Sequence, residues 1–305
     1  YIISTISIFV FIYLISKNIS EFQKLNIQLS YFSIFIIVFI FRHFFLTYIE
    51  WKMISKLNIK IAFSEYLVEN NLANLINLTS PLKIGAGKKL LYLKEKYNIQ
   101  AKDYFSIFTT LNIHLALLFF SFFFIGLIFI NILDVQFLFL FFVIFGLLIY
   151  ILKKFESNKF FKFIIIKDYF SSKNLNIFWF FTFLLIVSIT LGIFQTYFLI
   201  LSIFQFENLI GSLFINSASF FANIIQLSPG NVGFLELVFL SIDEIINLSA
   251  SQIIIYSAIN RVASIFIFLV ADINTTLFPI FDIHVSLHSS IVKFFSPYSF
   301  NRSLS

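Results

Sequence analysis

The sequence predicts an all-α, polytopic integral membrane protein: a helical bundle with two re-entrant, broken helix hairpins in an inverted repeat. The composition is 60% hydrophobic and only 12% charged, with a mean hydropathy of +0.96, which leaves too little polar surface to cover a soluble globule of 305 residues. Apolar runs recur as solid blocks, whereas a membrane β-barrel shows alternation of period two. Two segments broken by proline interrupt this series of blocks.

Uninterrupted apolar length defines the predicted spans, each suited to a hydrocarbon core of about 30 Å. They lie near residues 1–16, 31–48, 107–130, 135–152, 178–201 and 250–271. Because the chain starts with Tyr1 rather than Met, we expect the natural amino terminus to be missing and the first span to be trimmed. The alternative for 1–16 is the apolar part of a signal peptide, but no small-residue cleavage site follows it. We expect one transmembrane domain over 1–275, and an extra helix or a tail over 276–305.

Two segments, 63–97 and 208–248, do not fit the template of a span. Each breaks at a proline and then runs into charged residues, which cost about 2.5–3.5 kcal/mol each at the centre of a bilayer. Proline cannot donate the backbone hydrogen bond that a helix requires, and the glycines that follow tolerate positive φ, so both breaks suit a turn. We expect each segment to enter the membrane, turn near the midplane and return to the same side. The residues of the two turns are Pro81 and Gly85, and Pro229, Gly230 and Gly233.

The distribution of Lys and Arg predicts the topology. With both broken segments re-entrant, 18 of the 21 Lys and Arg fall on one face, in loops 42–60, 83–102 and 153–173 and in the carboxy-terminal tail. The other face receives only Lys17 and Lys24. The positive-inside rule makes the Lys-rich face cytoplasmic, and we expect a multi-pass protein of the plasma membrane. The two hairpins then enter from opposite faces, as in inverted-repeat transporters.

A polar stripe precedes the second turn. Its members recur at spacings of 4, 3, 4 and 3 and therefore share one helical face: Ser212, Asn216, Ser219, Asn223 and Gln226. Inside a membrane such a stripe requires water, a ligand or polar partners. One interpretation is interhelical hydrogen bonding that holds the bundle together; the other is the wall of a hydrated cavity that fits a head group.

A less regular polar stripe occurs in the first broken segment. Asn70, Asn74 and Asn77 share a face there, while Glu65 and Glu69 lie on another. A surface-lying amphipathic helix is the alternative for this segment.

Glu236 and Arg261 are predicted to form an ion pair. Glu236 lies three residues after Gly233, near the depth of the turn, and Arg261 lies midway along the span 250–271. Either charge alone would be strongly penalised in the membrane. The pair is either a structural lock between the hairpin and the last helix, or a site where Arg261 also binds a lipid phosphate bidentately.

Lys83 and Lys89 are candidates for the same anionic group, approached from the cytoplasmic half. The alternative is that both are ordinary positive-inside residues near the lipid head groups. Together with Asn216, Asn223, Glu236 and Arg261, these two lysines form the candidate substrate-binding set.

No pattern predicts a catalytic, metal or cofactor site. His114 is interpreted as a packing histidine, and His284 and His288 have no carboxylate or cysteine beside them to complete a metal site. Phosphate-binding glycine loops and a Ser-His-Asp set on a soluble loop are missing from the sequence. We therefore expect no cofactor, no metal ion and no nucleic-acid partner.

Two stretches resemble a known family. "SPGNVGFLELVFL" followed by "SASQIIIYSAINRVASI" is similar to the signature P-G-G-x-G-x-x-E and a later Tyr-Arg of the flippase-like membrane region of lysylphosphatidylglycerol synthases. Pro229, Gly230, Gly233 and Glu236 fall on this motif, and Arg261 matches the later arginine, although Tyr256 is displaced.

"NLINLTSPLKIGAGKKLLYLKEKYNI" resembles the first signature of that family, N-x-x-P-G-x-x-G-E followed by an arginine. Pro81 and Gly85 match, and Lys89 replaces the arginine. Leu82 and Ala86 stand where the family has a glycine and an acidic residue.

The resemblance covers roughly residues 1–275 and implies a stand-alone flippase-like protein without the soluble synthase domain, so aminoacylation of lipid is not expected. It implies a protein that translocates or handles a lipid or lipid-linked substrate with an anionic head group, such as an anionic phospholipid. A transporter is favoured over an enzyme. The alternatives are a membrane-embedded, lipid-linked glycosyltransferase-type enzyme and a non-transporting accessory factor of envelope lipid synthesis. Paired acidic residues that would hold a metal–nucleotide substrate are missing from the cytoplasmic loops.

Overall fold

The structure is a computed structural model that describes residues 19–57, 59–80, 83–131, 175–225 and 231–277, with a few isolated positions outside these ranges. All regular secondary structure in these residues is helical. Loop 153–173 and nearly all of the predicted spans 1–16 and 135–152 lie outside the described residues. The same holds for positions after 277 and for several residues singled out above: Pro81, Leu82, Gln226, Pro229, Gly230, His284 and His288.

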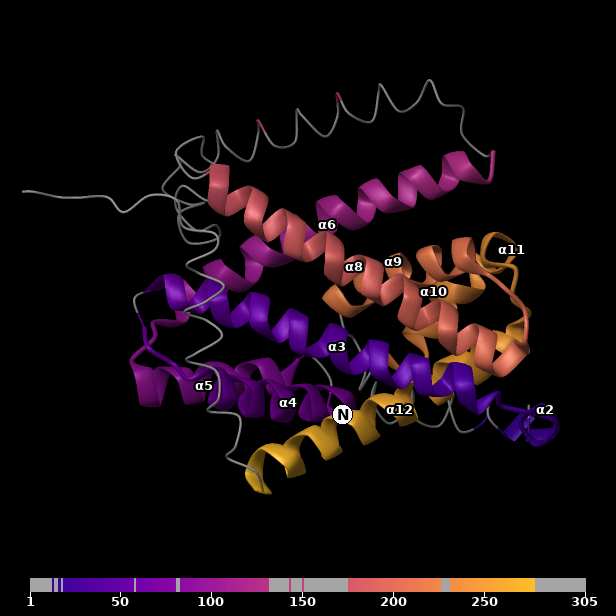
Figure 1. Ribbon diagram of the computed structural model, residues 1–305, viewed down its shortest axis with the longest axis horizontal. Helices are drawn as coiled ribbons and strands as arrows, with labels where there is room; N and C mark the ends of the chain where they lie inside the picture. Colours follow the sequence, from indigo (N-terminus) through magenta and orange to yellow (C-terminus); the bar gives the residue numbers. More distant parts are fainter. Residues whose placement is uncertain are drawn as a thin grey trace, which may run out of the picture.

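Four long apolar helices dominate the described fold (Figure 1). They are α3 (Leu29–Ile54), α6 (Ala101–Phe129), α8 (Leu175–Phe204) and α12 (Ala250–Leu277), and they overlap the predicted spans 31–48, 107–130, 178–201 and 250–271. Each is long and apolar enough to cross a bilayer, which takes about 20 residues of helix. No proline interrupts any of them.

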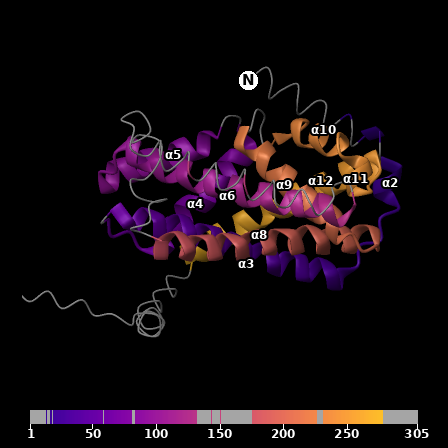
Figure 2. The same cartoon turned by 90° about the horizontal axis from the view of Figure 1, so that it is seen from above.

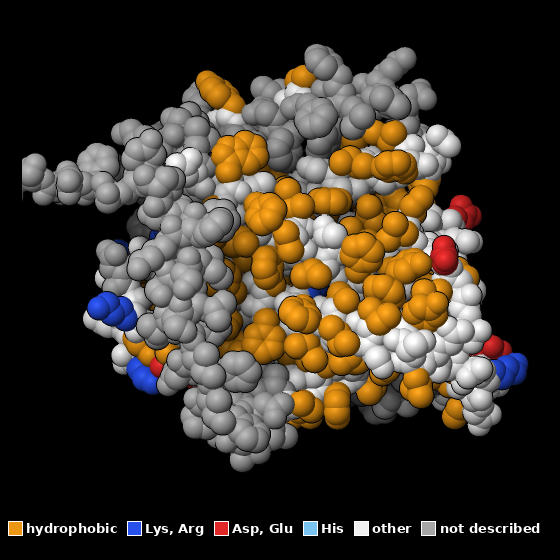
Figure 3. All heavy atoms as spheres, in the orientation of Figure 1, with side chains coloured by type: hydrophobic (Ala, Val, Ile, Leu, Met, Phe, Trp, Pro, Cys, Tyr) orange, Lys and Arg blue, Asp and Glu red, His pale blue; other side chains and the backbone are white. Residues whose placement is uncertain are grey.

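The outer surface of these helices is apolar. Phe41 on α3, Trp179 and Phe183 on α8 and Phe266 on α12 are among the large side chains that are more than 60% exposed. Figure 3 shows apolar side chains across the middle of one face and charged side chains at its left and right edges. An exposed apolar surface of this extent is typical of contact with lipid.

Helices α3 and α8 pack against each other in antiparallel directions along the bundle. At one end the backbone N–H of Gln28 donates to the carbonyl of Ser202 at 2.9 Å, and at the other end Ile54 and Phe181 share one apolar core. A second apolar core joins the amino-terminal half of α3 and the carboxy-terminal half of α8 to α9–α12. Buried polar side chains of α3, α8 and α9 lie along the helices between the two cores.

The segment 63–97 forms a helical hairpin, α4 (Phe63–Thr79) and α5 (Ile84–Tyr97), whose two helices pack together. The close approach of the two helices depends on Gly85. A Cβ there would lie 1.9 Å from the carbonyl oxygen of Ala73, and the Gly85 N–H donates to Asn77 Oδ1 at 2.9 Å. Helix α4 also packs against α3 and α12 and buries Tyr66, Leu67 and Ala73, so it is part of the helical bundle.

The segment 208–248 also folds back on itself. Helix α9 (Leu209–Ile225) is followed by two short helices, α10 (Phe234–Leu240) and α11 (Asp243–Ile246), which both pack against α9. Two residues with positive φ start the return: Asn231 at +56° and Gly233 at +83°. Glycine carries no Cβ penalty in this region, and asparagine tolerates it better than most residues.

Each half of the chain also packs into the other half. Helix α4 of the first hairpin lies against α12, and helix α9 of the second hairpin lies against α6. The hairpin α4–α5 and the short helices α10 and α11 lie toward opposite ends of the bundle (Figures 1 and 2). The polar residues of both hairpins therefore face long helices that are distant in sequence.

The position of Arg42 corrects the expected loop 42–60. The structure continues α3 as one helix to Ile54, followed by a short 3₁₀ helix, Ser55–Leu57, so that Arg42 lies in the middle of a long apolar helix. The charged residues at 42 and 50 suggested a loop, but Arg42 bonds to α8 and α9 and Glu50 bonds to α5, so the helix continues through both.

Candidate functional site

A cavity of about 330 Å³ is lined by the α4–α5 hairpin and by residues of α3, α6, α9 and α12. It brings together Lys83, Lys89 and Asn223, three of the predicted binding residues, from opposite halves of the chain. Its other polar lining residues are Glu50, Asn70, Asn74, Asn77, Tyr104 and Asn112. Ala73, Leu78, Phe108 and Phe268 add apolar walls. A cavity with apolar walls and a few convergent polar groups is the usual form of a small-ligand site.

Lys89 is the most completely bonded charge of this cavity. Its ammonium donates to Glu50 Oε2 at 2.9 Å and to Asn70 Oδ1 at 2.7 Å. The nitrogen lies 5.1 Å and 6.0 Å from the ring centres of Tyr66 and Tyr104, within the range of cation–π attraction. Lys89 is 5% exposed, and its charge is therefore compensated by direct contacts rather than by water.

Glu50 is the charged cavity residue that the sequence analysis did not single out. It supplies the carboxylate for Lys89 and also accepts a hydrogen bond from the Tyr66 hydroxyl at 3.1 Å. The first family signature carries an acid where this chain has Ala86, and here the carboxylate comes from α3 instead. The sequence does carry a signal for it, a third polar stripe: His43, Thr47 and Glu50 recur at spacings of 4 and 3.

This α3 stripe bonds to the hairpin along its length. Thr47 accepts a hydrogen bond from Asn70 Nδ2 at 2.8 Å, and His43 Nε2 bonds to Asn71 Oδ1. These hydrogen bonds offset part of the cost of burying the amides, although Asn71 Nδ2 has no partner among the described residues. The stripe thus fixes α4 against α3 and sets the position of Lys89 through Asn70.

Lys83 differs from Lys89 because it makes no ion pair within 4.0 Å with any described carboxylate. It adopts φ +53° at the turn before α5, and its nitrogen lies 5.2 Å from the centre of the Phe108 ring. The charged cavity lining is therefore Lys83, Lys89 and Glu50, two cations and one anion. This lining favours an anionic ligand.

Glu236 and Arg261 form the predicted ion pair, but neither is a lining residue of the cavity. Glu236 Oε1 accepts from Arg261 Nη1 and from the Ser257 hydroxyl. Glu236 Oε2 accepts from the Gly233 N–H at 2.8 Å and so caps α10. With Glu236 only 1% exposed, this geometry fits the structural lock between hairpin and last helix.

The predicted α9 stripe is divided between two environments. Asn223 lines the cavity and accepts from Asn231 Nδ2 at 2.7 Å, which ties the turn to α9. Asn216 is buried and accepts from Arg42 Nη2 at 3.2 Å. Ser212 and Ser219 bond to carbonyls of their own helix, those of Asn208 and Ile215.

His114 is a buried packing residue, in line with its interpretation. Its ring stacks on Phe178 with centres 4.8 Å apart, and Nε2 lies 3.0 Å from the hydroxyl of Thr182. Within the described part of the chain, no group of three or more His, Asp or Glu is arranged to hold a metal ion.

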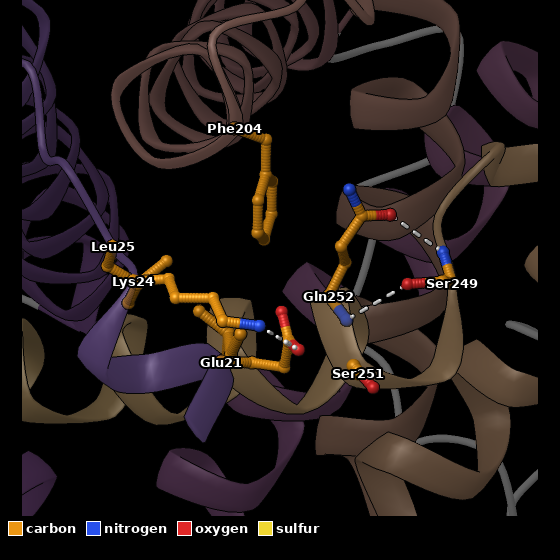
Figure 4. Close-up of a pocket in the computed structure, with 8 residues that line it drawn as sticks. Glu21, Lys24, Leu25, Phe204, Ser249, Ser251 and Gln252 are labelled. Carbon is orange, nitrogen blue, oxygen red and sulfur yellow. Dashed lines mark hydrogen bonds and ion pairs between the residues drawn. The ribbon is translucent and has the colours of Figure 1, made fainter. Parts of the chain in front are cut away.

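A second concavity, of about 550 Å³, lies between α2 (Ile19–Gln23), the end of α8 and the start of α12. Figure 4 shows two pairs of bonded polar residues there: Lys24 pairs with Glu21 at 3.3 Å, and Ser249 and Gln252 cap α12 reciprocally. None of the predicted binding residues lies there. The cavity at Lys83 and Lys89 is therefore the candidate site.

Long apolar helices, an apolar outer surface and a charged cavity between the helices define a multi-pass helical membrane protein. The family model for the lysylphosphatidylglycerol synthase TM region matches residues 1–271. The chain belongs to this family. Comparison with curated proteins and with solved structures gives no match.

Proposed function

We propose that the protein binds the anionic head group of a membrane lipid in the cavity at Lys83 and Lys89 and moves this head group between leaflets. The observation that carries the proposal is the charge of the cavity, where Lys83 has no carboxylate partner among the described residues. A phosphate oxygen is a suitable partner for an ammonium group of this kind. An anionic phospholipid and a lipid-linked intermediate both carry such a phosphate.

The arrangement of the helices supports movement between leaflets. We propose that both hairpins are re-entrant and that the two halves form an inverted repeat. In support, the exchanged contacts α4–α12 and α9–α6 relate the halves reciprocally, and the central pair α3–α8 is antiparallel. A site between two such hairpins is accessible from either face in turn, which is the principle of alternating access.

We further propose that the end of the bundle with α4–α5 faces the cytoplasm of the plasma membrane. The excess of Lys and Arg in loops on that side supports this orientation. Moving Arg42 from a loop into α3 leaves the charge asymmetry intact.

The test is lipid exchange in reconstituted vesicles with labelled phosphatidylglycerol. We expect exchange by the parent protein, and a decrease of about tenfold for Lys83→Gln, since a hydrogen bond to a charged group contributes about 1.5–3 kcal/mol. Lys88→Gln is the matched control, because Lys88 lies on α5, the helix that follows Lys83, is exposed and does not line the cavity. Equal exchange by the parent and by empty vesicles would remove the transport proposal. Product formation from a nucleotide sugar would instead favour the enzyme alternative.

A further inference from the structure

Arg42 lies at the middle of a helix that is long enough to cross the membrane. It is 13 residues after Leu29 and 12 before Ile54, so at about 1.5 Å per residue it lies roughly 18–20 Å from either end of α3. Its guanidinium points toward α8 and α9: Nη1 donates to Gln195 Oε1 at 2.9 Å and Nη2 donates to Asn216 Oδ1 at 3.2 Å. An ionisable residue at this depth is expensive and usually functional.

The charge of Arg42 is not balanced by any described carboxylate within 4.0 Å. The other two buried cations each have one, since Lys89 pairs with Glu50 and Arg261 pairs with Glu236. Arg42 contacts only neutral amides, and its Nε–H has no hydrogen-bond partner among the described residues. A guanidinium keeps its charge under all physiological conditions. Arg42 therefore carries a positive charge that no described carboxylate balances, at mid-depth in the bundle.

Gly192 on α8 provides the space for this guanidinium. A Cβ at position 192 would lie 2.8 Å from Arg42 Cζ and 2.8 Å from both amide atoms of Asn216. The guanidinium and the amide therefore rest directly against the backbone of α8. One arginine is thus oriented by residues of two helices, Gln195 and Gly192 on α8 and Asn216 on α9. The guanidinium therefore has a defined position and direction in the bundle.

Helix α9 connects Arg42 to the cavity. Asn216 at Arg42 and Asn223 in the cavity lie on one face of α9, seven residues apart, which corresponds to about 10 Å. We propose that Arg42 is a second oxyanion site at mid-depth, which binds the phosphate of the lipid after the head group leaves the cavity. This inference rests on the proposed function, and it assigns the substrate a phosphate group, because a guanidinium matches phosphate with parallel N–H donors.

The test measures binding rather than movement. The full chain is analysed by native mass spectrometry with phosphatidylglycerol, with phosphatidylcholine and with inorganic phosphate alone. We expect the parent to retain phosphatidylglycerol about tenfold more than phosphatidylcholine, whose phosphate is already balanced by its own choline cation. Arg42→Gln should lower this ratio without abolishing it, since the cavity at Lys83 and Lys89 remains. Gly192→Ala is expected to lower it as well, because the new methyl group displaces the guanidinium while every charge is kept.

Gly87→Ala is the matched control for Gly192→Ala, since a Cβ at position 87 meets no atom within 4 Å. The three atoms nearest to a methyl group at 192 are side-chain ends of Arg42 and Asn216, so this variant is expected to fold even if Arg42→Gln does not. Unchanged lipid preference in Gly192→Ala and in a folded Arg42→Gln would overturn the inference, as would equal loss in Gly87→Ala. If the protein retained inorganic phosphate but showed no preference between the lipids, the ligand at Arg42 would be a small oxyanion and not a lipid. This result would also overturn the inference.

Leaflet exchange is measured separately in vesicles. A parent protein that retains phosphatidylglycerol through Arg42 but exchanges no lipid would refute the proposed transport and leave the binding site standing.

Discussion

Lys89 on α5 is paired with Glu50 on α3 at 2.9 Å, which joins the first hairpin to a helix that precedes it. The second half of the chain has the opposite polarity, because the hairpin carries the carboxylate, Glu236, and the following helix carries the cation, Arg261. Only the first of these pairs lines the cavity. The two halves thus use similar pairs for different purposes: the first places a cation at a site, and the second fixes a helix start.

The first prediction concerns the Lys89–Glu50 pair. Glu50→Gln leaves a buried lysine without a carboxylate, and we expect it to destabilise the protein by about 3 kcal/mol, the lower end of the usual range of about 3–5 kcal/mol, because Glu50 is partly exposed. Thermal unfolding in detergent measures this. The double variant Glu50→Gln/Lys89→Gln should recover part of the loss, since the uncompensated charge is gone. If the double variant lost more free energy of unfolding than the two single variants lose together, the pairing would be contradicted.

The second prediction concerns Glu236. Glu236→Gln removes the carboxylate that bonds Arg261 and caps α10, so we expect a lower melting temperature and faster amide exchange at residues 234–240. Breaking a buried ion pair typically costs about 3–5 kcal/mol. Glu244→Gln is the control, because that side chain is exposed. Normal stability of Glu236→Gln with a loss of lipid retention would instead favour direct binding by this pair.

The third prediction separates two glycines of α5. Gly85→Ala places a methyl group 1.9 Å from the backbone oxygen of Ala73, which cannot move without separating α4 from α5. We expect the free energy of unfolding to decrease by about 3 kcal/mol or more, or folded protein not to accumulate. Gly87→Ala meets open space and is expected to be neutral or stabilising by up to about 1 kcal/mol. Expression level and melting temperature compare the two.

The fourth prediction concerns the effect of pH on the open end of the α4–α5 hairpin, where α4 begins and α5 ends. Burial alone would raise the pKa of Glu65, but hydrogen bonds from Lys96, Tyr92 and Tyr97 and the charge of Lys96 hold that pKa below its usual value. Because folding lowers the pKa of Glu65, its ionised carboxylate stabilises the folded protein at pH values above the pKa that Glu65 has in the unfolded chain. This stabilisation is lost as the pH falls through the pKa of Glu65 in the folded protein.

For Tyr97 the shift of the pKa on folding is in the opposite direction. Burial, with the hydrogen bond to Glu65, raises the pKa of Tyr97 to about 12. Its contribution is complete below the usual value of about 10 and is lost as pH rises through 12. We expect amide protection of residues 90–97 to decrease at both extremes, and Glu65→Gln to remove the acid limb. An acid limb that survives in Glu65→Gln would assign it to other groups.

The fifth prediction tests the re-entrant hairpins. The chain has no cysteine, so single cysteines report without background. Lys60 lies just before α4, Lys94 lies in the last turn of α5, and both are exposed. Cysteines replacing them should react with an impermeant thiol reagent from the same side of the membrane. Replacements of Glu207 and Glu244 should both react from the other side. Labelling of Lys60 and Lys94 replacements from opposite sides would show that the segment crosses the membrane.

Several features were predictable because they depend on local sequence. Apolar length predicts the long helices, since a helix satisfies its own backbone hydrogen bonds wherever its neighbours lie. The two proline-broken segments were recognised from their charges, and both fold back in the structure. The Glu236–Arg261 pair was predictable because each residue lies alone in an apolar segment and needs a partner of opposite charge.

The sequence by itself determined a helical membrane protein, its breaks and the faces on which polar residues lie. Only the tertiary structure decided which of these faces meet. Helical periodicity assigns Asn216 and Asn223 to one stripe, but in the packed bundle Asn216 bonds to Arg42 and Asn223 lines the cavity. Glu50 and Arg42 were assigned to a loop because hydropathy counts each charge as exposed, whereas Lys89, Gln195 and Asn216 satisfy them inside the bundle. The reason is physical: periodicity is a property of one helix, while the partner of a buried charge lies on another helix, distant in sequence, that packing brings into contact.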